Sequence, residues 1–130
     1  MHASNDRELD TAFSVLQEKH ARGLVVIPEI FTISRIKQIA ALALRYAVPA
    51  TFVDPQFAAA GGLMSYGGTI VETHRLAGIY AGRILKGEKP GDLPVMQGTK
   101  VELIINMKTA QALGITLPLS LLGRADGVIE

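Results

Sequence analysis

Short apolar runs alternate with amphipathic segments along the first half of this chain, and this alternation limits the possible fold more than any other feature. The run Leu24-Val25-Val26-Ile27 is continuous, rich in β-branched residues and closed by Pro28. Such a run predicts a strand that is buried on both faces. Ala50-Thr51-Phe52-Val53 predicts a second short strand. Strands separated by helical segments indicate an α/β protein with a parallel sheet.

The segments around these strands carry helical signals. Asn5 or Asp6 is placed to cap a first helix, which ends near Gly23. Thr32 or Ser34 is placed to cap a second helix. The remaining pattern predicts a helix over 70–85 with an inner stripe of apolar residues, a strand over 101–106, a short helix over 108–113 and a final helix over 118–129.

The stretch from Ala58 to Gly68 lies between the second strand and the long helix and is made almost wholly of small residues. Glycine supplies unusual backbone angles or steric room, so we expect something to approach this backbone closely. We interpret the stretch as a ligand loop or an interdomain crossover, with a boundary between residues 67 and 68. A tight turn without chemistry is the alternative interpretation.

Catalytic motifs do not fit this stretch. A phosphate-binding P-loop needs Lys followed by Ser or Thr after its last glycine, whereas Thr69 and Ile70 follow Gly68. A nucleophile elbow needs glycines two residues on each side of the serine, but Gly62 lies three residues before Ser65. Asp54, Ser65 and His74 could be drawn as a hydrolase triad, which only geometry can test. A small hydrolase that uses Ser65 is therefore the least favoured of the possible functions.

Composition excludes several other classes. The net charge is +1 and the basic residues are scattered, so a nucleic-acid partner is not expected. The absence of cysteine excludes disulfides and zinc–thiolate sites, and His74 has no second ligand four residues on, so no metal is predicted. No apolar run reaches the ~18–20 residues of a membrane-spanning helix, and the first residues are polar rather than signal-like.

Ligands of parallel α/β sheets bind beyond the carboxyl ends of the strands. This rule selects three loops, which cover residues 28–34, 54–57 and 65–69. Asp54 could receive an ammonium or hydroxyl group, although an Asp-Pro turn also explains it. Thr32 and Ser34 could bind a ligand or cap a helix, and Phe31 and Tyr66 could stack on a ligand or simply pack. Glu29 could line the rim, although a solvated loop carboxylate is the simpler interpretation.

A longer motif resembles a known family. It comprises Gly-Gly-Leu-Met-Ser-Tyr-Gly at 61–67, Arg-Ile-Leu-Lys-Gly-Glu-Lys-Pro-Gly-Asp-Leu-Pro-Val at 83–95, Thr-Lys-Val-Glu-Leu-Ile-Ile-Asn-Met-Lys-Thr-Ala at 99–110, and Leu113-Gly114. This order closely resembles the C-terminal portion of the ABC transporter substrate-binding proteins of the uncharacterised, tryptophan/tyrosine-type family, which have the periplasmic-binding-protein type I fold. The resemblance extends from about Asp6 to Glu130.

The resemblance implies a fragment of a two-lobed clamp whose lobes are Rossmann-like α/β layers and which traps a small solute at the hinge. Family members have about 300 residues, so residues 1–67 would be the last βαβ part of the second lobe and residues 68–130 a helix-strand-helix segment returning to the first. Such proteins bind solute for an ABC permease, without catalysis or a cofactor. They act in the periplasm; a chain with no further leader would stay in the cytoplasm.

The resemblance also bears on single residues. Thr32 matches a polar ligand-contacting position, and Asp54 matches an acidic position that can hold an amino group. Ile30 and Phe31 stand where amino-acid-binding relatives carry polar residues, and Thr69 stands where some carry aspartate. The implied site is therefore Phe31, Thr32, Asp54, Ser65, Tyr66 and Thr69, and the solute is either an amino acid or a more apolar or aromatic compound.

A chain with parts of two lobes would leave strand edges and helix faces uncovered, including the helix face with Leu76, Ile79 and Ile84. We therefore predict a homodimer or higher oligomer that buries more than ~2,000 Å², and exchange of the segment from Ile70 onward between copies is one way to form it. The alternative function is a free-standing α/β interaction or regulatory domain that no longer captures solute, and a stable folded monomer would favour it.

Overall fold

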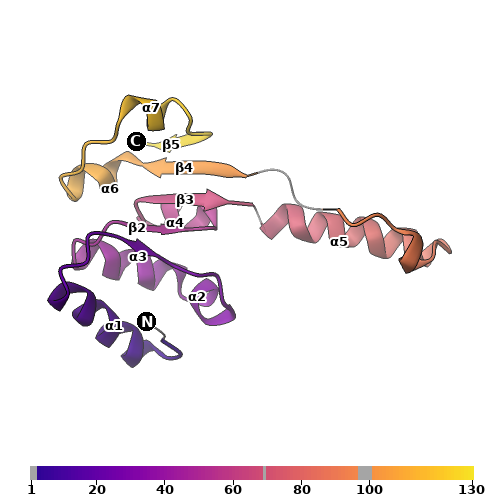
Figure 1. The fold of residues 1–130 in the computed structure, drawn as a ribbon, viewed down its shortest axis with the longest axis horizontal. Helices are drawn as coiled ribbons and strands as arrows, with labels where there is room; N and C mark the ends of the chain where they lie inside the picture. The colour runs from indigo at the N-terminus through magenta and orange to yellow at the C-terminus, as the bar shows by residue number, and fades with distance from the viewer. Residues whose placement is uncertain (1–2, 69, 97–100) are drawn as a thin grey trace.

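The computed structural model describes residues 3–68, 70–96 and 101–130. They form an α/β fold with one five-stranded sheet and one long helix that projects away from it (Figure 1). The strands are β1 (Leu24–Val25), β2 (Ala50–Phe52), β3 (Met64–Gly67), β4 (Glu102–Asn106) and β5 (Gly127–Ile129). The helices are α1 (Asp6–Glu18), α2 (Ile30–Ser34), α3 (Ile36–Arg45), α4 (Pro55–Ala59), α5 (Ile70–Leu85), α6 (Met107–Ala112) and α7 (Leu119–Leu122), with a 3-10 turn η1 (Pro90–Asp92).

The sheet has the order β1-β2-β3-β4-β5 and is mostly parallel, with one antiparallel pair, β3–β4. The α/β prediction is confirmed, but the sheet is mixed rather than wholly parallel. The strand at 101–106 shares a sheet with β1 and β2 in the described residues, because β4 pairs with β3 (Met64 opposite Ile105). How segments 1–67 and 68–130 are divided in a longer protein stays a prediction.

The first helix forms as the sequence predicts. Asn5 caps α1 by accepting a hydrogen bond from the Glu8 backbone N–H at 2.9 Å. Leu9 and Phe13, four residues apart, bring one face of α1 into the core. The core lies between α1, α3, α4 and the sheet, and its buried members are Leu9, Phe13, Val26, Ile36, Ile39, Ala40, Leu42, Ala43, Ala50, Phe52 and Phe57.

The predicted second helix is two helices, α2 and α3, which meet at Arg35. The N-cap of α2 is Glu29, so neither Thr32 nor Ser34 has this role. Thr32 is the N3 residue of the capping box that Glu29 begins. The Thr32 hydroxyl accepts a hydrogen bond from the Glu29 N–H at 2.8 Å. The capping prediction was therefore right about the kind of contact but wrong about its position.

The strand over 24–27 is shorter and more exposed than predicted. Val26 is buried, whereas Val25 and Ile27 are exposed. Successive strand residues point to opposite faces, so one face of β1 packs on the core and the other is open in the described part of the chain. β1 is also an edge strand. The expectation of burial on both faces is therefore wrong.

The glycine-rich stretch is not a single loop, because it contains the central strand β3. Gly61, with φ +101°, turns the chain after α4. A Cβ on Gly62 would lie 2.2 Å from Cε1 of Phe57, and one on Gly67 would lie 2.7 Å from the Val53 carbonyl oxygen. The predicted close approach is confirmed, and the groups that approach belong to the protein itself.

The C-terminal prediction is right only in its first part. The strand at 101–106 and the short helix appear as β4 and α6. The predicted helix over 118–129 is instead the single turn α7 followed by β5, which pairs with β4. The Asp126 carboxylate accepts a hydrogen bond from the Leu103 backbone N–H at 2.8 Å and so holds the start of β5 against β4.

Helix α5 has the predicted bounds but not the predicted packing. None of its described residues is buried, so the expected inner stripe is wrong. The chain folds back along it: the Tyr80 hydroxyl donates to the Pro94 carbonyl, and Arg83 pairs with Glu88 at 2.6 Å. The Arg83 guanidinium lowers the pKa of Glu88. Among the described residues, no helix combines the length and the apolar character needed to cross a bilayer.

Candidate functional site

The three parallel strands β1, β2 and β3 end at one edge of the sheet, as the strand-end rule requires. Helix α2 follows β1 and helix α4 follows β2, while β3 ends at Gly67 just before α5. The predicted loops therefore start from a common edge. Thr69, one of the predicted site residues, lies outside the described residues.

Asp54 is only 4 % exposed and is the N-cap of α4. Its Oδ1 accepts a hydrogen bond from the Gln56 backbone N–H at 2.8 Å, and Pro55 occupies the first turn of the helix. Proline with its fixed φ suits this position, which explains the Asp-Pro pair locally. The Asp54 carboxylate thus has a structural role whether or not a solute contacts it.

The polar groups of α2 are also used within the protein. The Thr32 hydroxyl lies 2.8 Å from the Ile27 carbonyl oxygen, to which it donates, and the Ser34 hydroxyl donates to the Phe31 carbonyl at 2.7 Å. The Arg35 guanidinium lies over the Phe31 ring at 5.7 Å and also pairs with Asp6 at 2.7 Å. These contacts fix α2 at the end of β1 and hold the Phe31 ring in place.

Ser65 and Tyr66 are adjacent on β3 and point to opposite faces of the sheet. Ser65 is fully buried and lies between Phe52 and Ile104 in the strand register, and its hydroxyl has no hydrogen-bond partner among the described residues. Tyr66 is 63 % exposed. Of this pair, only Tyr66 presents a surface that a solute could contact without rearrangement.

Asp54, Ser65 and His74 do not form a catalytic triad in the described structure. The Ser65 hydroxyl is unpartnered, the His74 ring nitrogen Nδ1 lies 2.8 Å from the Ile70 carbonyl oxygen, and Asp54 caps α4. A serine nucleophile requires a base within hydrogen-bond reach. Within 3–68, 70–96 and 101–130, no three His, Asp or Glu side chains gather as a metal site would require.

Large apolar side chains are exposed at the strand-end edge. Ile27 follows β1, Ile30 begins α2 with 91 % of its surface exposed, and Tyr66 lies near the end of β3. No motif in the sequence marks Ile27 or Ile30 as candidate site residues. The one sequence signal for an apolar edge is Ile30, which stands where amino-acid-binding relatives carry a polar residue.

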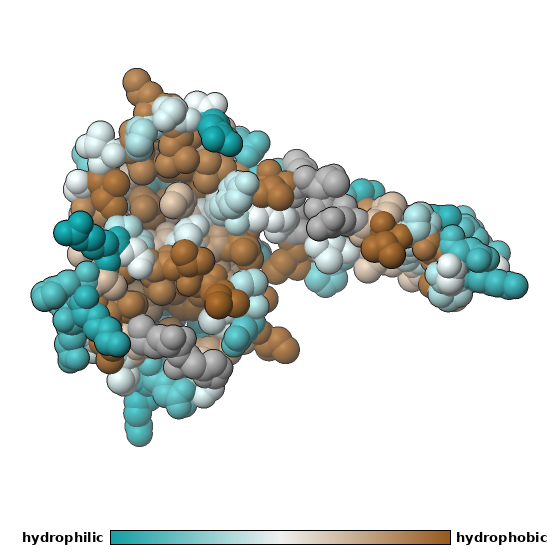
Figure 2. Space-filling model, viewed as in Figure 1, coloured by the Kyte–Doolittle hydropathy of each residue, from teal (hydrophilic) through white to brown (hydrophobic). Residues whose placement is uncertain are grey.

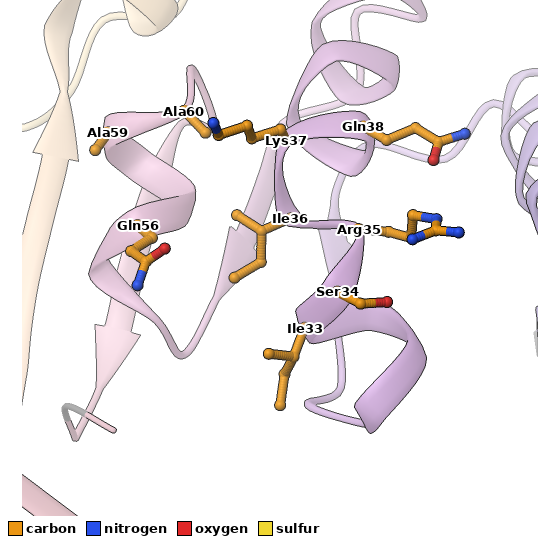
Figure 3. Close-up of a pocket in the computed structure, with 9 residues that line it drawn as sticks. All are labelled: Ile33, Ser34, Arg35, Ile36, Lys37, Gln38, Gln56, Ala59 and Ala60. Atoms are coloured by element: carbon orange, nitrogen blue, oxygen red, sulfur yellow. The ribbon is translucent and has the colours of Figure 1, made fainter. Parts of the chain in front are cut away.

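Two surface hollows lie near this edge. One, of about 510 Å³, separates α3 from α4, and Figure 3 shows Lys37 extending towards Ala60 across it while Arg35 and Gln38 point away. Ser34 lines this hollow, whereas Phe31, Thr32, Asp54, Ser65 and Tyr66 are not among its lining residues. The other, of about 390 Å³, is mainly apolar, lies between α1 and β1, and includes Thr32 and Ile27 in its lining.

The cap role of Asp54 gives a prediction that separates structure from binding. Asp54→Ala should lower the free energy of unfolding by about 1–2 kcal/mol, because it removes a buried N-cap. Asp54→Asn should stay within a few tenths of a kcal/mol of the original chain, because asparagine caps as well. Urea unfolding followed by circular dichroism measures both. Equal stability of the alanine variant and the original chain would contradict the cap role.

The sequence matches the family described as ABC transporter substrate binding protein over residues 1–129. The chain belongs to this family. The resemblance inferred from the sequence motifs is thereby confirmed, and the family is one of substrate-binding proteins rather than catalysts. No curated protein was found to match the sequence.

Solved structures agree with the family assignment. A conserved domain protein from Vibrio cholerae is 25% identical with a TM-score of 0.86, over 97% of this chain and 42% of that one. The ABC domain from Streptococcus pneumoniae in complex with L-Trp is 28% identical with a TM-score of 0.81, over 95% of this chain and 42% of that one. A ligand-free, open substrate-binding protein with adhesive properties from Clostridium difficile is 22% identical with a TM-score of 0.65, over 98% of this chain and 42% of that one. At this identity the similarity supports the fold only. The chain thus spans well under half the length of these relatives.

Proposed function

We propose that these residues form part of the solute-binding component of an ABC importer and supply one wall of its solute cleft. The observation that carries this proposal is the exposed edge at the ends of β1, β2 and β3 in a member of a substrate-binding family. The partners would be a small organic solute and an ABC permease, and the working compartment would be the periplasm.

We propose further that the solute presents an aromatic or apolar group to this wall. The polar candidates Thr32 and Asp54 are engaged in helix caps, whereas Tyr66 and Ile30 are exposed and the Phe31 ring is held under Arg35. Exposed apolar groups at such an edge gain free energy when a ring covers them. The relative solved with L-Trp supports this class of solute. An amino group of the solute would then contact Asp54 or Thr32, which follow the ends of β2 and β1.

L-Trp is a suitable first probe, because the chain has no tryptophan and the emission of the ligand is therefore observed directly. Titration of the 130-residue chain should give a dissociation constant on the order of 0.1–1 mM, as expected for one wall of a cleft. Amide NMR shifts should change at residues 27–34, 54–57 and 64–68. Shifts confined to other parts of the chain, or none at all with L-Trp, L-Tyr and L-Leu, would refute the proposal.

Tyr66 provides the sharpest variant in this titration. Tyr66→Ala should weaken binding of L-Trp about tenfold, because it removes the exposed ring on which the indole would stack. Tyr66→Phe keeps the ring and should bind within about twofold of the original chain. Asp54→Asn, which keeps the cap, tests in the same assay whether the carboxylate charge contributes. Equal affinity of the alanine variant and the original chain would remove Tyr66 from the site.

A further inference from the structure

Two buried polar side chains from the C-terminal part of the chain bind the end of α4. Asn106 is the last residue of β4, Thr109 lies in the first turn of α6, and they are 6 % and 5 % exposed. The Asn106 Nδ2 donates to the Ala58 carbonyl at 2.9 Å. The Thr109 hydroxyl donates to the Gly61 carbonyl, also at 2.9 Å. We call these two hydrogen bonds the α4 latch.

The α4 latch does not depend on what covers the surface of this chain. Hydrophobic residues are exposed on the body and on the projecting part (Figure 2). The chain spans 42% of each solved relative, so the rest of a longer protein can cover those residues, and the expected homodimer stays a prediction. Asn106 and Thr109 are already buried by the described residues, and added chain would only bury them further.

Helix α4 needs directional contacts to hold its place. It has only five residues, too few for a helix that is stable by itself. Its residues Phe57 and Ala58 are buried, and the helix contacts β3 and β4. Apolar burial is non-directional, so it does not by itself fix how a short helix is shifted or rotated on a sheet. Hydrogen bonds to the carbonyls at its end do fix this.

The other end of α4 carries Asp54. Asp54 lies four residues before Ala58, about 6 Å along the helix axis. The Phe57 backbone N–H donates to the Asp54 carbonyl at 2.9 Å, so the two ends move as one unit. The cap of α4 uses Oδ1 of the Asp54 carboxylate, and Oδ2 is the oxygen that a solute amino group would meet. A binding site tolerates shifts of only about 0.5 Å, so a displaced α4 would weaken this contact.

The residue types at both latch positions fit this role. Aspartate or serine would cap α6 about as well as Asn106 does, but of the three only asparagine has an amide NH₂ to donate. The cap of α6 uses the backbone N–H of Thr109, which donates to the Asn106 Oδ1 at 3.0 Å. The cap therefore needs neither the Asn106 amide nitrogen nor the Thr109 hydroxyl, and both of these groups serve α4.

We propose that Asn106 and Thr109 are positioning residues of the solute edge, and that through the α4 latch they set where α4 holds the Asp54 carboxylate. This inference rests on the proposed function. Neither residue contacts the solute, and both act through α4.

Two substitutions each remove one donor of the latch. Thr109→Val keeps the shape and the backbone N–H, and Asn106→Asp keeps a capping oxygen. In the 130-residue chain each should raise the dissociation constant for L-Trp at least about fivefold. The dissociation constant for 3-indolepropionate, which lacks the amino group, should stay within about twofold. Thr109→Ser keeps the hydroxyl and should bind L-Trp within about twofold of the original chain.

Thr11→Val is the matched control, because the Thr11 hydroxyl donates to the Arg7 carbonyl on the exposed surface of α1. It should change neither dissociation constant. The amide NMR shift of Gln56, whose N–H donates to Asp54, reports the position of the carboxylate without any ligand. This shift should move in Thr109→Val and Asn106→Asp and return in Thr109→Ser. Circular dichroism confirms that each variant is folded under the conditions of the titration.

Latch variants that unfold at lower urea concentration, but keep the Gln56 shift and the L-Trp affinity of the original chain, would overturn the proposal. Equal weakening for L-Trp and 3-indolepropionate would overturn the role of Asp54 in it. If neither ligand binds the original chain, the proposed function fails. The Gln56 shift then decides by itself whether the latch sets the position of α4, so the two failures are distinguishable.

Discussion

Phe57→Ala should lower the free energy of unfolding by about 3–5 kcal/mol, the largest effect expected of any single substitution considered for this chain. Phe57 on α4 is buried, its ring centroid lies 5.9 Å from that of Phe52 on β2, and it packs against Gly62. Removing it leaves a cavity between α4 and the centre of the sheet. Urea unfolding at a fixed protein concentration measures the change.

Gly62 provides a coupled test of the same packing. Gly62→Ala alone should destabilise the chain, because its Cβ would lie within 2.2 Å of Cε1 of Phe57. In the Phe57→Ala background the same change should be neutral or stabilising, because the methyl group enters the vacated space. The double-mutant cycle should therefore show a coupling energy of about 1 kcal/mol or more. Additive effects would show that the two sites do not contact each other in solution.

Asn106→Ala should lower the free energy of unfolding by about 2–4 kcal/mol. Asn106 is buried at the end of β4, where its Oδ1 caps α6 by accepting from the Thr109 N–H at 3.0 Å. Its Nδ2 donates to the Ala58 carbonyl of α4 at 2.9 Å. Alanine removes the cap of α6 and the bond from Asn106 to the Ala58 carbonyl, which keeps only its backbone contact with the Gly61 N–H at 3.2 Å. The expected loss of stability therefore has a local part, the cap of α6, and a tertiary part, the bond between β4 and α4.

Asn5→Ala separates these two parts. Asn5 caps α1 in the same way but at the surface, and within the described part of the chain its side chain bonds only to the Glu8 N–H of that helix. Its loss should cost about 1 kcal/mol. The excess cost at Asn106 then measures the bond between β4 and α4. If the two variants unfold at the same urea concentration with equal slopes, the buried bond contributes nothing measurable.

The sequence alone predicted the elements whose signals are local. The cap and apolar spacing of α1, the full length of α5 and the presence of α6, one residue earlier than predicted, follow from residues within one or two turns of each other. The family motif spans most of the chain and predicted the fold class. The strand-end rule likewise predicts that Phe31, Asp54 and Tyr66 lie near one edge of the sheet.

Tertiary pairing decided the rest. Met64–Gly67 lacks β-branched residues and is flanked by glycine, and it is a strand because β2 and β4 hydrogen-bond to it from both sides. Gly127–Ile129 becomes a strand only by pairing with β4. The exposure of Val25, and of Val71 and Leu85 on α5, depends on which elements pack against them, and no local pattern encodes this. The cap roles of Asp54 and Thr32 are local, but the absence of cover over Tyr66 is a property of the assembled sheet. Local hydrogen bonds and periodicity are encoded within short segments, whereas burial depends on contacts between residues far apart in the chain.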